Sequence, residues 1–299
     1  AARALIYLAG LLDDLDRVPE AVEYVRRAIR AAQPFGIDLR VAAAMGLGSV
    51  LSERGDPEAA KHASLAIELC RSGGSAEQLA AALPTAAMVC WQVGADDQAR
   101  AFADEARPMH ASTKRIARVV LFSVSAGLAL AAGDVGAAID IGSVADEEGT
   151  ELGVEREMPL IRAVLARAHL AAGDRTRAVD RASAAIDAAL GMRFAYPLAV
   201  CLETAVLILR DCGSATDADL AAWVSAAGAI RRRGNRPRPR RGVARGLSRG
   251  HPRPRVGTDD HPARSGLVAS RHRRRHAADR SRLRRLRRRL RQLRPQPYA

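Results

Sequence analysis

The sequence is poor in aromatic residues and lysines, and it has neither a phosphate-binding loop nor a long apolar run. Aromatic residues make up 3% of the 299 residues, so a core built on large rings is excluded. The two lysines, Lys61 and Lys114, do not follow a glycine-rich GxxxxGK[ST] loop, so we expect no ATP binding or hydrolysis. The longest apolar run, residues 119–132, has 14 residues. A membrane span needs roughly 18 or more, so we expect a buried helix there and no membrane span.

Cysteines are few and have no metal-binding pattern. None forms a CxxC pair, which argues against a metal site or a redox motif; they are Cys70, Cys90, Cys201 and Cys212. Cys90 and Cys201 lie in apolar runs, where a free cysteine behaves as a small hydrophobic residue. We therefore expect a cytoplasmic protein without metal or cofactor. The sequence opens inside a helix-like stretch, without a start methionine or signal-peptide pattern, and we interpret it as a fragment.

Charge divides the chain into two parts. Residues 231–299 hold 25 arginines and 3 aspartates, a net charge of +22, whereas the whole chain has a net charge of +14. Residues 1–230 therefore carry a net charge of −8. The basic character belongs to the C-terminal part alone, and the remainder is mildly acidic.

A repeat of 39 or 40 residues runs through the acidic part. Its turn positions are 16, 55, 94, 133, 173 and 213, occupied by glycine in every copy except Asp16. Small residues recur seven positions before the turn and five and twelve positions after it, except for Ile67 in the second copy and a weaker match in the sixth. A fixed period of this size is typical of a stacked helical solenoid. Glycine suits the left-handed end of a helix. Asp56, Asp134 and Asp174 suit the cap of the next helix.

The repeat predicts six antiparallel helix pairs and no strands. The expected ranges are 2–14 with 18–32, 38–54 with 57–71, 76–93 with 96–107, 113–132 with 135–148, 155–172 with 175–190, and 195–211 with 216–232. We assign residues 1–233 to one all-α domain, a right-handed superhelical array. Its core should consist mainly of alanine, leucine, valine and isoleucine, and its stability should come from stacking between repeats.

The small residue, glycine turn and two alanines resemble the tetratricopeptide helix-turn-helix pattern. The period exceeds the usual 34 residues, so a longer loop is expected after each second helix. The array is similar to the repeat regions of large ATP-dependent, LuxR-type bacterial transcriptional regulators. The segment 226–237 resembles the end of such an array. This resemblance implies a sensor or protein-interaction region that lies between an ATPase domain and a DNA-binding domain, neither of which is found in this sequence.

No catalytic constellation emerges. His62, His110 and His169 are far apart and have no paired-ligand spacing. The paired acids lie at expected turns or helix ends, where capping or solvated carboxylates are common, and no serine lies in a Gly-x-Ser-x-Gly setting. We therefore expect a protein that is not an enzyme. The first helix of each pair should line the inner wall of the array. Polar residues there are candidate contacts for a partner, although any one of them is more often a plain surface residue than a binding hot spot; they are Gln92, Arg118, Arg162, Arg167 and His169.

The segment 234–299 is rich in arginine and proline, a composition that predicts disorder. Three interpretations stay open: unselected sequence such as an out-of-frame reading, an arm that binds nucleic acid non-specifically, or a surface helix on an anionic membrane. We favour the first and expect the segment to add nothing to the fold. One stretch differs, because its leucines have helical spacing in an arginine-rich run; they are Leu283, Leu286, Leu290 and Leu293.

The sequence thus favours a non-enzymatic helical-repeat interaction or sensor module of a bacterial transcriptional regulator. Its expected partner is a protein or a small effector held in the concave groove. The alternative is a nucleic-acid-binding protein that acts through its arginine-rich C-terminal segment.

Overall fold

The computed structural model describes residues 2–14, 17–109, 114–190, 195–233 and 281–290. Within these ranges the chain is helical and has no strand. The helices are α1 (Ala2–Asp14), α2 (Val18–Ala32), α3 (Ile37–Glu53), α4 (Glu58–Gly73), α5 (Ala76–Val93), α6 (Asp96–Ala106), η1 (Arg107–Met109), α7 (Arg115–Ala132), α8 (Val135–Glu151), α9 (Met158–Ala171), α10 (Arg175–Leu190), α11 (Ala195–Asp211) and α12 (Asp217–Arg233). A further helix covers residues 281–290. The predicted all-α fold and six helix pairs are confirmed.

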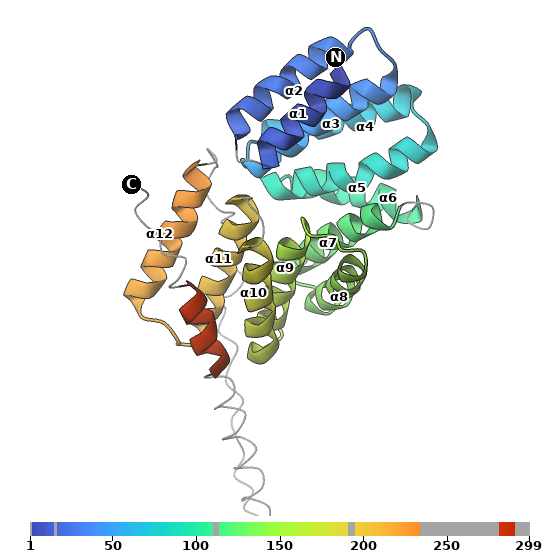
Figure 1. Cartoon of the computed structure of the whole chain (residues 1–299). Coiled ribbons are helices and arrows are strands. Elements are labelled where there is room, and N and C mark those ends of the chain that lie inside the picture. The colour runs from blue at the N-terminus through green and yellow to red at the C-terminus, as the bar shows by residue number, and fades with distance from the viewer. Residues whose placement is uncertain (1, 15–16, 110–113, 191–194, 234–280, 291–299) are drawn as a thin grey trace, which may run out of the picture.

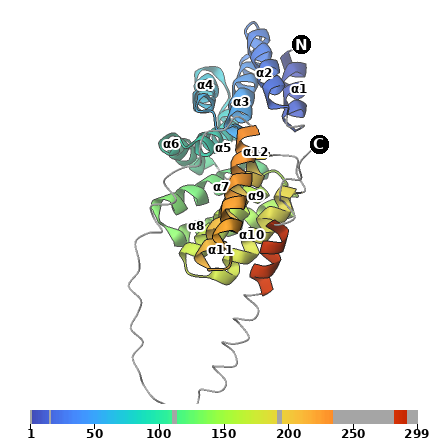
Figure 2. The same cartoon turned by 90° about the vertical axis from the view of Figure 1, so that its left-hand side faces the viewer.

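The pairs stack into two layers (Figures 1 and 2). Each odd-numbered helix from α1 to α9 contacts the next odd-numbered helix. Each even-numbered helix from α2 to α10 packs on the odd-numbered helix that follows it, while backbone contacts between successive even-numbered helices are sparser. The odd-numbered helices therefore form the inner layer of a curved stack, and the even-numbered helices form the outer layer.

The predicted turns close in one common geometry. The glycines at 55, 94, 133, 173 and 213 all have positive φ, between 57° and 86°. After each of them, the next backbone N–H donates to the carbonyl five residues earlier, for example from Asp134 to Ala129 at 3.0 Å and from Asp174 to His169 at 2.9 Å. This bond is the Schellman closure of a helix end. Asp134 then accepts from the Ala137 N–H at 3.0 Å and caps α8, as the sequence predicted.

The sequence analysis did not predict the turn at Gly153. Gly153 also has a positive φ of 64°, and Val154 N–H donates to the Gly149 carbonyl at 2.9 Å. The same closure therefore ends α8 at Glu151, and α9 begins only at Met158, with Pro159 in its first turn. The predicted helix start at 155 is wrong for this reason. The connection 152–157 becomes an irregular segment that carries Arg156.

The residues that make this repeat longer than the standard 34 lie mainly in the helices. Helices α3 and α4 contain 17 and 16 residues, nearly the 34 residues of a whole standard repeat. Only Gly74 and Ser75 separate α4 from α5, so the expected long loop is absent there. Ser75 caps α5 through a reciprocal pair of hydrogen bonds with Gln78, which starts the helix at once.

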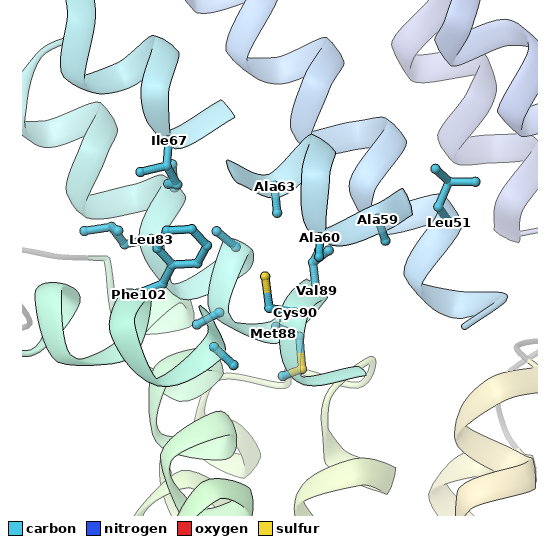
Figure 3. Packing of buried hydrophobic residues seen from close by; sticks show 14 of the residues in the cluster. Leu51, Ala59, Ala60, Ala63, Ile67, Leu83, Met88, Val89, Cys90 and Phe102 are labelled. Carbon is cyan, nitrogen blue, oxygen red and sulfur yellow. The ribbon is translucent and has the colours of Figure 1, made fainter. Parts of the chain in front are cut away.

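Small side chains form the contacts between helices in the first five pairs. In Figure 3, Ala59, Ala60 and Ala63 of α4 lie beside Val89 and Cys90 of α5, within one buried cluster. The residues five positions after the turn are buried in these pairs; they are Ala21, Ala60, Ala99, Ala138 and Ala178. The residues twelve positions after the turn are also buried; they are Ala28, Ile67, Ala106, Ala145 and Ala185. The repeat pattern therefore identified the helix faces that enter the core.

The sixth pair departs from this pattern. Ala218 and Ser225, the corresponding residues of α12, are exposed. Asp219, Trp223 and Ala227 are buried instead, at a spacing of four residues. Because the Trp223 ring enters the core, α12 is rotated about its axis relative to the earlier even-numbered helices.

Glycine permits a close approach between α5 and α7. The face of Gly127 lies directly against the indole ring of Trp91, so an added Cβ would overlap the ring atoms Cζ2, Cε2 and Nε1. Gly142 of α8 has the same relation to Leu165 of α9, where an added Cβ would lie 2.9 Å from Cδ2. These glycines are therefore packing residues.

Helix α7 carries the apolar run noted in the sequence. It is the one helix in the described ranges that is long and apolar enough to cross a membrane by length and composition. About half of the helix is buried against its neighbours, including Val119, Leu121, Val124 and Leu128, whereas Ile116 near its start is exposed. A core helix of a helical array meets the same criterion, so this feature is weak evidence for a span.

The expectation that the C-terminal segment adds nothing to the fold is wrong for residues 281–290. These residues form a helix whose Leu286 and Leu290 are fully buried, with Leu283 packed against the same cluster. The leucine spacing explains this, because residues three and four apart share one face of a helix. The predicted disorder of residues 234–280 and 291–299, including Leu293, lies outside the described residues.

Replacing Gly127 with alanine should lower the free energy of unfolding by about 1–3 kcal/mol, because the rigid Trp91 ring must move to admit a methyl group. Thermal and urea melts of the full chain measure the change. Gly136 is the matched control, since it is an exposed helical glycine whose nearest neighbouring atom would lie 3.8 Å from the new Cβ. Gly136→Ala should leave stability unchanged or raise it by up to about 1 kcal/mol. Equal losses in both variants would contradict this account of the α5–α7 contact.

Candidate interaction surfaces

Two of the five residues named as candidate partner contacts connect successive inner helices. Ser52 Oγ of α3 donates to Gln92 Oε1 of α5 at 2.6 Å. Arg167 Nε of α9 donates to Thr204 Oγ1 of α11 at 2.8 Å. Both bonds join positions about one repeat apart, so these side chains connect neighbouring repeats within the inner layer.

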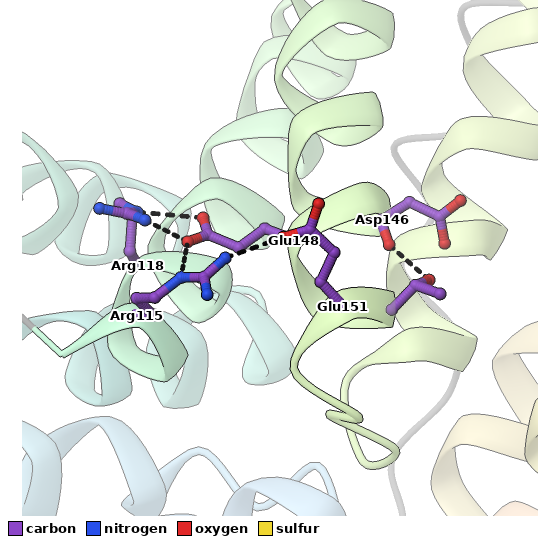
Figure 4. A network of polar contacts seen from close by, with 6 residues as sticks. Arg115, Arg118, Asp146, Glu148 and Glu151 are labelled. Atoms are coloured by element: carbon purple, nitrogen blue, oxygen red, sulfur yellow. Dashed lines mark hydrogen bonds and ion pairs between the residues drawn. The ribbon is translucent and has the colours of Figure 1, made fainter.

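Arg118 and Arg162 bind one acidic stretch of α8, and Figure 4 shows the contacts of Arg115 and Arg118 with Glu148. Arg118 Nε donates to Glu148 Oε2 at 3.0 Å, and Arg115 Nε donates to Glu148 Oε1 at 3.1 Å. Arg162 Nε of α9 donates to Asp146 Oδ1 at 2.9 Å, and Arg181 of α10 binds the other oxygen of that carboxylate. The two carboxylates thus connect four helices, α7 to α10.

The Glu148 carboxylate is nearly buried, with 10% of its side chain exposed. The hydrogen bond from Arg118, supported by the bond from Arg115, lowers the pKa of Glu148 despite the opposing effect of burial. The group therefore stays ionised when folded, and its charge is matched by two guanidinium groups.

Burial shifts the pKa values of one histidine and two cysteines. His169, the fifth candidate contact, is 4% exposed, and burial lowers its pKa, which favours the neutral ring. Burial raises the pKa of the Cys201 thiol to about 12 and that of Cys90 to about 11. Thiols with such pKa values supply almost no thiolate at neutral pH. In the described part of the chain, no group of three or more His, Cys, Asp or Glu side chains is arranged to hold a metal ion.

An ion-pair contact that the sequence did not predict joins distant repeats. Arg156, in the connection between α8 and α9, lies 3.3 Å from the Asp13 carboxylate of α1 and also binds the Glu53 carboxylate of α3. Both carboxylates are almost fully buried, whereas the Arg156 side chain is 46% exposed. The contacts span 143 and 103 residues, so no local pattern could have revealed them.

The most exposed apolar surface lies on α1. Tyr7 is 71% exposed, Leu11 is 61% exposed and Leu8 is 37% exposed, and their spacing places them on one side of the helix. The position of Leu11 is buried in every later repeat, where it is occupied by Val50, Val89, Leu128, Ala168 and Ile208. Leu8 corresponds to a buried residue in four of the five later repeats, namely Leu47, Ala86, Leu165 and Ala205. The first helix thus exposes a face that the later repeats cover.

Comparison with known proteins gives a limited result. No protein-family model matches the chain, and no curated protein matches its sequence. Among solved structures, the chain is similar to BtubC (BKLC) from P. vanneervenii, with 16% sequence identity and a TM-score of 0.46. The similarity covers 89% of this chain and 99% of that one.

Replacing Glu148 with glutamine should destabilise the protein by about 1–2 kcal/mol at pH 7, because two arginines lose a charged acceptor. The folded pKa of Glu148 is lowered, so its stabilisation is complete above the unfolded pKa of about 4.3 and is lost as pH falls through the folded value. Melts from pH 7 to pH 3 should show the difference between the two proteins shrinking below about pH 4.3.

Glu151 provides the control, because its side chain is 69% exposed and binds Arg115 alone among these arginines. Glu151→Gln should change stability little at any pH. A Glu148→Gln deficit that persists undiminished at pH 3 would show that the side chain acts through shape and not through its charge.

Proposed function

We propose that this protein is a non-enzymatic helical-repeat interaction module whose partner is a polypeptide. The observation that carries the proposal is the apolar face of α1, formed by Tyr7, Leu8 and Leu11. Every later odd-numbered helix packs against the even-numbered helix before it. The α1 face has the equivalent residue positions and so suits an amphipathic helix, supplied by a partner or by an earlier segment of a longer chain.

A polypeptide helix fits this face better than a small effector does. The exposed side chains form a stripe along one helix, and a second helix can pack along such a stripe over its whole length. Small molecules are usually enclosed by concave pockets that bury most of their surface. A buried histidine and buried thiols of high pKa also favour a binding role over a catalytic one.

We further propose that the module serves a cytoplasmic bacterial transcriptional regulator of the large LuxR-type class. The support is the sequence resemblance, namely the small residue, the glycine turn and the two alanines that recur in most of the repeats. In this role the array would bind its partner on the α1 face and pass the bound state to other domains through the stacked inner helices.

The proposal predicts that helical peptides select the α1 face. Phage-displayed helical peptides, enriched on the immobilised full chain, should share apolar residues at helical spacing, because they must cover Tyr7, Leu8 and Leu11. A Tyr7→Glu/Leu11→Glu variant should bind the enriched peptides at least about 10-fold more weakly, since a charge would be buried against an apolar stripe. Both residues are exposed, so the variant should melt as the parent does.

Val224 supplies the control for this experiment, because it is an apolar residue that is 55% exposed on α12. Val224→Glu should leave peptide binding unchanged. The proposal fails if no helical peptide is enriched, or if the enriched peptides bind the α1 variant and the Val224 variant equally well.

A second candidate function is non-specific binding of nucleic acid by the C-terminal helix. Arg284, Arg285 and Arg288 are exposed on residues 281–290, whereas the other three arginines of this helix are partly buried. Arginines neutralise phosphates without reading bases, so such binding depends on salt and not on sequence.

This second candidate predicts a salt-dependent affinity that is the same for unrelated duplexes. Replacing Arg284, Arg285 and Arg288 with alanine should reduce the slope of log affinity against log salt by up to about 3, roughly one unit for each phosphate contact. Titrations of two duplexes at several salt concentrations measure both quantities. A preference for one duplex at high salt, or an unchanged slope in the variant, would rule this role out for the helix.

A further inference from the structure

The C-terminal helix, residues 281–290, docks on the two last even-numbered helices. It lies near α10 and the beginning of α12 in both views of the chain (Figures 1 and 2). Leu286 and Leu290 have no exposed surface and belong to the same buried cluster as Ile186 of α10 and Trp223 of α12. A segment remote in sequence therefore completes the core at this end of the array.

Three ion pairs surround the buried leucines. Arg282 lies 3.0 Å from Asp180 and Arg289 lies 2.7 Å from Asp187, both on α10. Arg287 lies 2.9 Å from Asp219, the buried carboxylate of α12. Half of the helix's six arginines thus face acidic side chains, while its leucines face the apolar cluster.

The pairing with α10 has a defined direction and register. Arg282 and Arg289 are seven residues apart, and so are their partners Asp180 and Asp187. Because the pairs follow the same order along both helices, the C-terminal helix runs parallel to α10. Leu283, Leu286 and Leu290 follow the 3-4 spacing of a coiled-coil seam, so charge and apolar contacts repeat with the same period.

We propose that this surface of α10 and α12 is a docking site for a basic, leucine-striped helix. Here the site is called the α10–α12 surface and is defined by Asp180, Asp187, Asp219 and the buried cluster beside them. Residues 281–290 occupy it within the same chain, so a partner that presents a helix of the same kind must displace them. The site is separate from the α1 face and does not depend on the function proposed for that face.

The chemistry of the α10–α12 surface favours a basic helix over other occupants. Its carboxylates repel acidic or phosphorylated segments, and a purely apolar helix would not supply the guanidinium that Arg287 places beside the buried Asp219 carboxylate. The carboxylates of Asp180 and Asp187 are half exposed, so salt screens their attraction. Affinity should therefore fall with ionic strength, whereas the leucine contacts persist.

A labelled peptide of residues 280–292 tests the proposal by fluorescence anisotropy. Its receptors are the full chain and a full-chain Leu286→Asp/Leu290→Asp variant, in which the chain's own helix is detached. The peptide should bind the variant at least 10-fold more tightly than the parent, because the attached helix competes at high effective concentration. A peptide with the same two leucine substitutions should not bind either receptor.

Charge reversal then tests the register. In the detached variant, Asp180→Arg/Asp187→Arg should weaken binding of the peptide at least 10-fold, and a peptide with Arg282→Asp/Arg289→Asp should restore it. The matched control reverses Asp140 and Glu147 of α8, which are exposed and occupy the equivalent positions one repeat earlier. That control carries the same change in net charge and should leave the affinity unchanged.

Several results would overturn the proposal. One is equal peptide binding to the parent and the detached variant, and another is no binding to the detached variant. Equal weakening by the control pair would indicate general charge attraction. A parent chain that sediments as a dimer, and a detached variant that sediments as a monomer, would show that the helix docks on a second copy. If the leucine variant loses helicity beyond its C-terminal helix, Arg282→Asp/Arg289→Asp in the full chain provides a second way to detach it.

Discussion

The array depends on close contact between helices whose facing side chains are small. Alanine and glycine occupy the repeated crossing positions, and at one of these contacts the Trp91 ring lies directly on Gly127. A core of this kind buries little apolar area per residue, so each pair is stable only through its neighbours. The inner hydrogen bonds, the acidic stretch of α8 and the docked C-terminal helix all require the spacing that these small residues set.

Local sequence features predicted the helix pairs and the faces that enter the core. A glycine turn and its helix cap are determined within about six residues, so the five glycine turns and the caps at Asp134 and Asp174 were visible in the sequence. The pattern failed where a larger side chain changed the packing. Trp223 rotates α12, which leaves Ala218 and Ser225 exposed although the repeat register had placed them in the core.

The candidate surfaces were much less predictable, because they depend on contacts between distant residues. The sequence analysis gave Arg118, Arg162 and Arg167 as candidate partner contacts, but in the structure each binds a neighbouring helix. The leucine spacing of residues 281–290 was evident, whereas its acidic partners required the register against α10. The sequence analysis did not single out Tyr7 or Leu11, and their exposure is visible only in the structure.

The Arg156 contact changes the mechanical character of the array. In a helical solenoid, each repeat contacts only its neighbours. Such an array can therefore unfold from either end, one pair at a time. Arg156 braces the ends of α1 and α3 against the connection between α8 and α9. These ion pairs connect the first pair with the segment after the fourth pair, so α1 cannot detach until the contact between Arg156 and Asp13 breaks. Unfolding from the first pair must therefore break this long-range contact as well as the packing between neighbouring pairs.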